Sequence, residues 1–186
     1  MGVGKSMRHS DIRRLTVMAL LVAVLAVCSQ LAVPVGSVPV TAQTLAVLLI
    51  ALLLPPKHAM LTVLAWVLAG ALGLPFFANF KSGFGVLLGP TGGYIYGFIV
   101  SAGLVSWLAG RQGSKFSLLR SVLACTVGIV FSYFFGAVQL MLLLDLDSYA
   151  AAFLLGGVPY IFFEPVKIAA AVLMTRLMWR RGLKRF

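Results

Sequence analysis

The chain has 186 residues, of which 61% are hydrophobic and only 10% are charged. Soluble domains have an apolar share closer to one half, so this composition excludes an ordinary soluble domain and predicts one membrane domain over residues 1–186. A formal net charge of +11 would suggest a nucleic-acid partner in a soluble protein. Here the basic residues lie in short segments between apolar runs, which is typical of signals that orient a membrane protein, and we expect no nucleic acid to bind.

Six apolar segments follow one another along the chain. A hydrocarbon core of about 30 Å needs roughly 20 apolar residues as helix, and fewer where neighbouring protein shields the ends. The segments cover residues 15–33, 40–54, 59–74, 92–110, 121–144 and 159–178. Prolines such as Pro55, Pro56 and Pro75 interrupt the helical pattern between them. The sequence therefore predicts an all-α integral membrane protein with six transmembrane helices.

The basic residues test this segmentation independently of hydropathy. Thirteen of the 15 Lys and Arg residues lie before the first segment, after the second, after the fourth, or from the end of the sixth segment (Arg176) onwards. The two exceptions are Lys81, in an opposite connection, and Lys167, within the last segment. Because basic residues accumulate on the cytoplasmic side, we predict a multi-pass protein of the cell membrane with both termini in the cytoplasm.

The first segment carries two small residues, Ala19 and Ala23, one helical turn apart. This small-xxx-small spacing allows another helix to approach closely. Spacing alone favours packing within the same chain over docking of a separate subunit, and it leaves both interpretations open.

The short second segment carries Gln43 near its outer end. An amide in a membrane helix forms an interhelical hydrogen bond or contacts a ligand, and the sequence does not separate the two.

The second outer connection, residues 75–91, is unusually apolar for a loop and contains four phenylalanines. Apolar groups gain free energy by leaving water, so we predict that it folds back onto the helices as a lid. The alternative is a loop in the lipid headgroup layer. Asn79 is a polar residue in the apolar stretch PFFANF, which makes it either a ligand-binding residue or a solvated turn residue.

The loop joins the fourth segment through GPTGGY, residues 89–94. Glycines permit close backbone approach, and free N–H groups at a helix start favour an anion such as a carboxylate. Thr91, Gly93 and Tyr94 are therefore candidate binding residues. The alternative is an ordinary Gly-Pro break before a helix.

The last segment carries Glu164 and Lys167 within an apolar run. An ionisable residue in the middle of a membrane helix costs roughly 2.5 to 3.5 kcal/mol on insertion scales and usually faces a functional cavity. At i and i+3 the two side chains share one helical face. A carboxylate and an ammonium together suit a group with both donors and an acceptor, such as a urea, an amide or a heterocycle. The alternative is a structural ion pair, although desolvation makes such pairs a weak source of stability.

Several kinds of chemistry have no support in the sequence. There is no nucleotide-binding motif, no cluster of metal ligands, and no nucleophile beside a base within the apolar segments. We therefore expect neither an enzyme nor a resident metal or cofactor, and no ATP site in this chain.

Four motifs in order give the chain a family resemblance. SVPVTAQTLAVLL (37–49), GALGLPFFANF (70–80), GVLLGPTGGYIYGF (85–98) and EPVK (164–167) resemble the BioY family of biotin transporters. Members of that family are substrate-binding S components of energy-coupling factor transporters. The resemblance implies the S-component fold, biotin as the transported ligand, and partners comprising a transmembrane T component and two cytoplasmic ATPase subunits.

The resemblance also implies roles for single residues. Ala19 and Ala23 match the motif by which an S component docks on the T component. Asn79 and Lys167 match residues that bind the biotin head group, while Glu164 stands where the family usually has aspartate.

The sequence leaves open where the ligand carboxylate binds and which function the chain has. For the ligand carboxylate the candidates are Gln43, Thr91 and the backbone from Gly92 to Tyr94. The whole chain could also be an S component for another vitamin, such as thiamine or riboflavin, or a membrane scaffold subunit in which Glu164 and Lys167 are structural.

Overall fold

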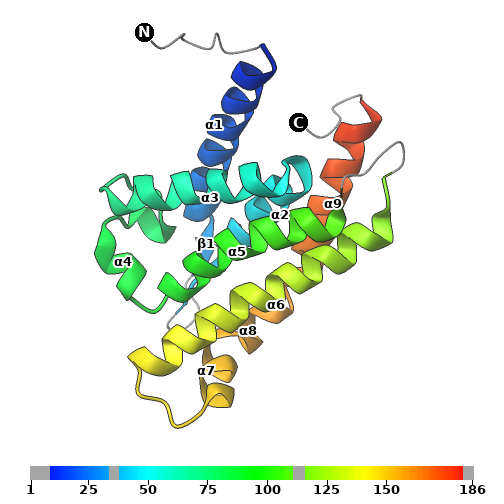
Figure 1. The fold of residues 1–186 in the computed structure, drawn as a ribbon. Coiled ribbons are helices and arrows are strands. Elements are labelled where there is room, and N and C mark those ends of the chain that lie inside the picture. Colours follow the sequence, from blue (N-terminus) through cyan, green and yellow to red (C-terminus); the bar gives the residue numbers. More distant parts are fainter. Residues whose placement is uncertain (1–8, 34–37, 111–115, 182–186) are drawn as a thin grey trace, which may run out of the picture.

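A computed structural model describes residues 9–33, 38–110 and 116–181. The described chain is mostly helical (Figure 1), and six helices make up its framework: α1 His9–Gln30, α2 Gln43–Leu53, α3 Pro56–Ala71, α5 Gly92–Ala109, α6 Leu118–Leu143 and α9 Glu164–Arg180. The shorter elements are η1 Ala78–Phe80, α4 Phe84–Leu88, α7 Tyr149–Gly156 and α8 Val158–Ile161. Strands β1 Ala32–Val33 and β2 Val40–Thr41 form a small antiparallel ladder that the all-α prediction did not include.

Three of these helices are long and apolar enough to cross a membrane. They are Asp11–Gln30 within α1, Gly92–Ala109 and Leu118–Leu143. The remaining framework helices α2, α3 and α9 have 11, 16 and 17 residues. Six membrane spans therefore stay a prediction.

Helix α2 lies at the centre of the bundle. Every residue from Ala46 to Leu54 is buried, and the helix contacts α1, α3, α5, α6 and α9. A helix surrounded by neighbours is apolar on all sides, which explains its continuous apolar sequence.

Small residues bring α5 and α6 together beside α2. A Cβ at Gly128 would lie 2.2 Å from Val105 Cγ2, and one at Gly97 would lie 2.8 Å from Ser132 Cα. In the space between the helices, the Ser101 hydroxyl donates to the Gly128 carbonyl at 2.5 Å. Glycine at these contacts allows a close helix pair, as is common in membrane bundles.

The predicted sixth helix, residues 159–178, is wrong at its N-terminal end. The structure has the short α8, a break at Phe162 and Phe163, and then α9 from Glu164. Pro165 is in the first turn of α9, where its missing N–H costs nothing, whereas inside a longer helix it would lose a hydrogen bond and clash with the preceding turn. Glu164 therefore lies at the start of a helix and not in the middle of one.

The connection over residues 75–91 packs one face against the bundle. The Phe77 side chain is 1% exposed, and its ring meets Trp66 edge-on at a centroid distance of 5.2 Å. Phe80 and Leu88, in contrast, are 71% and 72% exposed. The loop thus folds back on the helices as predicted and keeps a second, outward apolar face.

Helix α1 is the least enclosed of the three candidate spans. Only 17% of its apolar window is buried, and Figure 1 shows it projecting from the other helices. Ala19 and Ala23 are both exposed, so these two residues do not serve packing within the described part of the chain.

Candidate binding cavity

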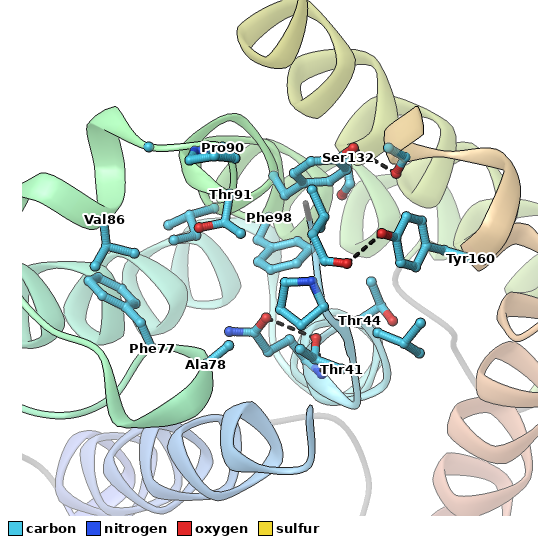
Figure 2. Close-up of a pocket in the computed structure, with 18 of the residues that line it drawn as sticks. Thr41, Thr44, Phe77, Ala78, Val86, Pro90, Thr91, Phe98, Ser132 and Tyr160 are labelled. Carbon is cyan, nitrogen blue, oxygen red and sulfur yellow. Dashed lines mark hydrogen bonds between the residues drawn. The ribbon is translucent and has the colours of Figure 1, made fainter. Parts of the chain in front are cut away.

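A cavity of about 260 Å³ lies where the 75–91 loop meets α2, α5, α6, α8 and α9. Six of the seven predicted binding residues line it: Gln43, Asn79, Thr91, Tyr94, Glu164 and Lys167. In Figure 2, Phe77 and Val86 border one side of the cavity, and Thr44 and Tyr160 lie on the opposite side. The structure therefore brings together residues that are as much as 124 positions apart along the chain.

Glu164 and Lys167 form the polar end of this cavity. The Lys167 ammonium donates to Glu164 Oε1 at 2.8 Å, and the Tyr133 hydroxyl donates to the same oxygen at 3.1 Å. The Thr44 hydroxyl reaches it more weakly at 3.4 Å. Three donors from three helices thus fix the position of this carboxylate.

The second oxygen of that carboxylate is in a different situation. Glu164 is only 4% exposed, and its Oε2 is buried without a hydrogen-bond partner among the described residues. A buried acceptor left unpaired costs about 1 to 3 kcal/mol. Oε2 is therefore an acceptor that none of the described residues uses.

The helix start adds to the electrostatics of this site. Glu164 lies in the first turn of α9, where the N–H groups and the helix dipole favour a negative charge by about 0.3 to 1 kcal/mol. Together with the Lys167 ammonium, this explains how a charged carboxylate remains in a largely buried position.

Gln43 makes an interhelical hydrogen bond and also lines the cavity. Its Nε2 donates to Ser29 Oγ on α1 at 3.1 Å, which is an interhelical contact, and its Oε1 accepts from the Thr41 hydroxyl at 2.9 Å. The residue is 7% exposed and also lines the cavity. An amide has two donors and an acceptor with two lone pairs, so capacity for a ligand remains.

The glycines of GPTGGY serve close packing. A Cβ at Gly92 would lie 1.8 Å from the Leu87 carbonyl oxygen, and one at Gly93 would lie 2.3 Å from that of Phe135. Gly93 is not among the residues that line the cavity, whereas Thr91 and Tyr94 are. The Tyr94 hydroxyl donates to the Gly156 carbonyl at 2.7 Å, which joins α5 to the end of α7.

Several polar cavity residues did not emerge from the sequence. Tyr133 and Tyr160 lie in apolar stretches where an aromatic residue does not stand out by hydropathy, and Thr44 is a small residue at the start of an apolar helix. Lys81 is exposed and lines the cavity. Its isolation from the other basic residues was a usable signal, because it is the one basic residue in the predicted outer connections.

Apolar side chains make up much of the remaining wall, including Phe77, Val86, Ile95 and Phe98. A pocket with an apolar wall and a few convergent polar groups is typical of a small-molecule binding site. The described residues contain no group of three or more His, Cys, Asp or Glu that could hold a metal ion. The arrangement suits a neutral polar ring at Glu164 and Lys167, with an aliphatic part along the wall.

Comparison with known proteins gives one consistent result. The model of the BioY family matches residues 5–184. The biotin transporter BioY2 of Lactococcus lactis subsp. cremoris is 37% identical over 169 residues, which is 91% of this chain and 90% of the relative. The biotin transporter BioY of Thermotoga maritima is 37% identical over 162 residues, 87% of this chain and 93% of the relative.

The fold also matches a solved structure. The crystal structure of the S-component for biotin from an ECF-type ABC transporter aligns with a TM-score of 0.86 at 21% identity. The alignment covers 94% of this chain and 95% of the other. The described helices therefore adopt the S-component fold.

Proposed function

Because the chain belongs to the BioY family, a family of membrane transporters and not of enzymes, we propose that it captures biotin and takes part in its uptake into the cell. The observation that carries this proposal is the pair of Glu164 and Lys167 lining a cavity of about 260 Å³, with Glu164 Oε2 unpaired among the described residues. The ureido ring of biotin has N–H donors and a carbonyl acceptor, which match an unpaired carboxylate oxygen and an ammonium.

Within this proposal, Glu164 and Lys167 bind the ureido ring, with Asn79 closing over it from the loop. Tyr133 and Thr44 act indirectly, by holding Glu164 Oε1. Glu164 therefore contacts the ligand through one oxygen and orients Lys167 through the other.

The aliphatic chain of biotin would run along the apolar wall towards its carboxylate. Gln43, Thr91 and Tyr94 remain candidates for that group, and Lys81 joins them because its side chain supplies a positive charge at the same cavity. The predicted role of Gly93 has less support, since it lies outside the lining.

We further propose that the whole chain is one domain of six membrane spans with both ends in the cytoplasm. Figure 1 supports an even number of spans, because the start of α1 and the end of α9 lie on the same side of the bundle. In this arrangement the cavity opens towards the outside. The short helices α2, α3 and α9 would cross with their ends shielded by protein.

Energy for uptake would come from other subunits. We propose that a transmembrane T component docks on the exposed Ala19 and Ala23 of α1, and that two cytoplasmic ATPase subunits complete the transporter. The chain itself then needs no cofactor and no ATP site.

Titration of the purified full chain with biotin, followed by calorimetry, tests the ligand. We expect saturable binding of one biotin, and no heat from thiamine or riboflavin at equal concentration. Binding of either of those vitamins without a response to biotin would replace biotin as the ligand. A folded protein that ignores all three would favour a scaffold with a structural ion pair.

A further inference from the structure

Gln30, the last residue of α1, reaches the cavity loop through its side-chain amide. Its Nε2 donates to the carbonyl oxygens of Pro75 at 3.1 Å and Phe77 at 3.2 Å, besides that of Ala26 in its own helix at 3.2 Å. Its Oε1 accepts from the Phe80 N–H at 2.8 Å. One side chain thus holds the loop on both sides of Asn79.

The backbone between these anchors is in an unfavourable conformation. Asn79 and Phe80 both have φ of 58°, in the left-handed region that L-residues rarely enter. Asparagine tolerates this region, but a bulky residue such as Phe80 does so only where its surroundings enforce it. The Phe80 side chain is 71% exposed, so tertiary packing of that ring does not provide the enforcement.

Other contacts fix the residues on either side of this turn. The Phe77 ring is 1% exposed and packs beside Trp66, and the Gly83 N–H donates to the Gly70 carbonyl at 2.8 Å. Between them, the Phe77 N–H donates to the Lys81 carbonyl at 3.1 Å. Across the turn, the Lys81 N–H reaches the Ala78 carbonyl at 3.4 Å, which is a long hydrogen bond. Among the described residues, the shorter bond from the Phe80 N–H to Gln30 at 2.8 Å is the one that a left-handed residue makes itself.

We propose that Gln30 is a positioning residue for ligand binding: it stabilises the left-handed turn at residues 79–80 and so places Asn79 at the cavity. This inference rests on the proposed function for its ligand, biotin. It adds a residue outside the cavity lining and assigns to α1 a direct influence on the site. Loss of the amide would let the turn relax and move Asn79 away from the ligand.

Binding measurements on the full-length protein in detergent test the proposal. Gln30→Met keeps the length of the side chain and removes its hydrogen bonds, and we expect biotin binding to weaken about tenfold, the effect of losing one to two net hydrogen bonds. In an Asn79→Ala background the same change should have almost no effect, because residues that act through one another are not additive.

A rescue variant distinguishes positioning from a general loss of packing. Glycine adopts a φ of 58° without strain, so adding Phe80→Gly to Gln30→Met should restore most of the lost affinity. Unchanged biotin affinity in Gln30→Met would overturn the proposal. An effect that adds fully to Asn79→Ala, or that Phe80→Gly does not rescue, would also overturn it.

Two further measurements keep the result decisive. Where Gln30→Met fails to give a monodisperse protein, Gln30→Glu replaces it. This variant keeps an acceptor for Phe80 but sets a carboxylate oxygen against the carbonyls of Pro75 and Phe77, so we expect at least as large a loss of affinity. Where the wild-type protein ignores biotin, the proposed function fails, and hydrogen exchange of residues 77–83 decides the role of Gln30. Faster exchange in the variant supports it, and unchanged exchange overturns it.

Discussion

The two carboxylate oxygens of Glu164 are in different surroundings. Oε1 accepts from Lys167, Tyr133 and Thr44, whereas Oε2 is buried without a partner in the described part of the chain. A carboxyl group held at one oxygen is a preorganised acceptor at the other, which reduces the cost of ordering on binding.

Removing a polar side chain of the proposed site should weaken ligand binding in a protein that still folds. We expect Lys167→Ala and Asn79→Ala each to weaken biotin binding about tenfold to hundredfold, because each leaves a ligand group unpaired in a dry site. Calorimetry on the purified protein measures this, with Lys57→Ala as the control, since Lys57 is exposed and lies outside the cavity lining. Wild-type affinity in both cavity variants would contradict the site assignment.

A double variant separates a ligand-binding pair from a structural one. Glu164→Gln with Lys167→Met removes both charges, so no buried charge is left unpaired. We expect this protein to fold and melt near the wild-type temperature but to bind no biotin. Retained binding would show that the pair is only structural.

Single cavity residues were predicted from the sequence where a polar or charged side chain stood in an apolar stretch. Glu164, Lys167 and Asn79 stood out as polar groups in apolar stretches, and all three line the cavity. Tyr133 did not, because an aromatic residue in an apolar helix has no local signal and its partner is 31 positions away. Gln30 was not predicted for the same reason, since its loop partners are 45 to 50 positions further along the chain.

At the level of elements, the loop end and α5 are joined through a very close backbone contact at Gly92. A Cβ there would lie 1.8 Å from the Leu87 carbonyl oxygen and 2.5 Å from Gln139 Nε2. The Gln139 amide itself donates to the carbonyls of Leu87 and Gly89 at 2.9 and 2.7 Å. Gln139 on α6 therefore fixes the far end of the loop whose near end Gln30 holds.

Alanine at this contact should destabilise the protein. We expect Gly92→Ala to cost about 1 to 3 kcal/mol, the usual effect of inserting an atom into a filled space. Gly85→Ala is the matched control, because a Cβ at that position meets nothing within 4 Å. Thermal unfolding in detergent compares the two variants. Equal melting temperatures would show that the loop end shifts to accommodate the added methyl group without loss of stability.

The exposed face of α1 leads to a prediction about assembly. Phenylalanine at both Ala19 and Ala23 would prevent close approach of another helix, so we expect the T component and the ATPase subunits to be lost on purification. Biotin binding by the isolated chain should be unchanged. Leu20→Phe, at an exposed position of the same helix, serves as control, and normal co-purification of the double variant would exclude this docking face.

Helices were predictable within a few residues where an apolar run ended at glycine or at a charged residue. The expected segment 92–110 corresponds to α5 Gly92–Ala109, and 121–144 corresponds to α6 Leu118–Leu143. The last segment was different, because hydropathy continues unchanged across the break at Phe162 and Phe163. Only the backbone requirement of Pro165 marks the start of α9, and that signal was outweighed by the apolar run around it.

For the whole molecule, the proposed orientation is open to a labelling test. We expect a membrane-impermeant maleimide to label Ser82→Cys in intact cells and to label Lys57→Cys only after permeabilisation. Both positions are exposed, and the test requires a background in which Cys28 and Cys125 are replaced. Labelling in the opposite pattern would invert the topology.

The charges around the cavity have a consequence for the energetics of transport. Its lining contains the cations Lys81 and Lys167 and the anion Glu164, a net charge of +1 that one ligand carboxylate would neutralise. Moving an elementary charge through the membrane potential involves about 2.3 kcal/mol per 100 mV. A step that carries the loaded site across that field would therefore be independent of voltage. Return of the empty site would move one positive charge outward against an inside-negative potential. The membrane voltage would therefore oppose the return of the empty site and would not affect the inward step with ligand bound.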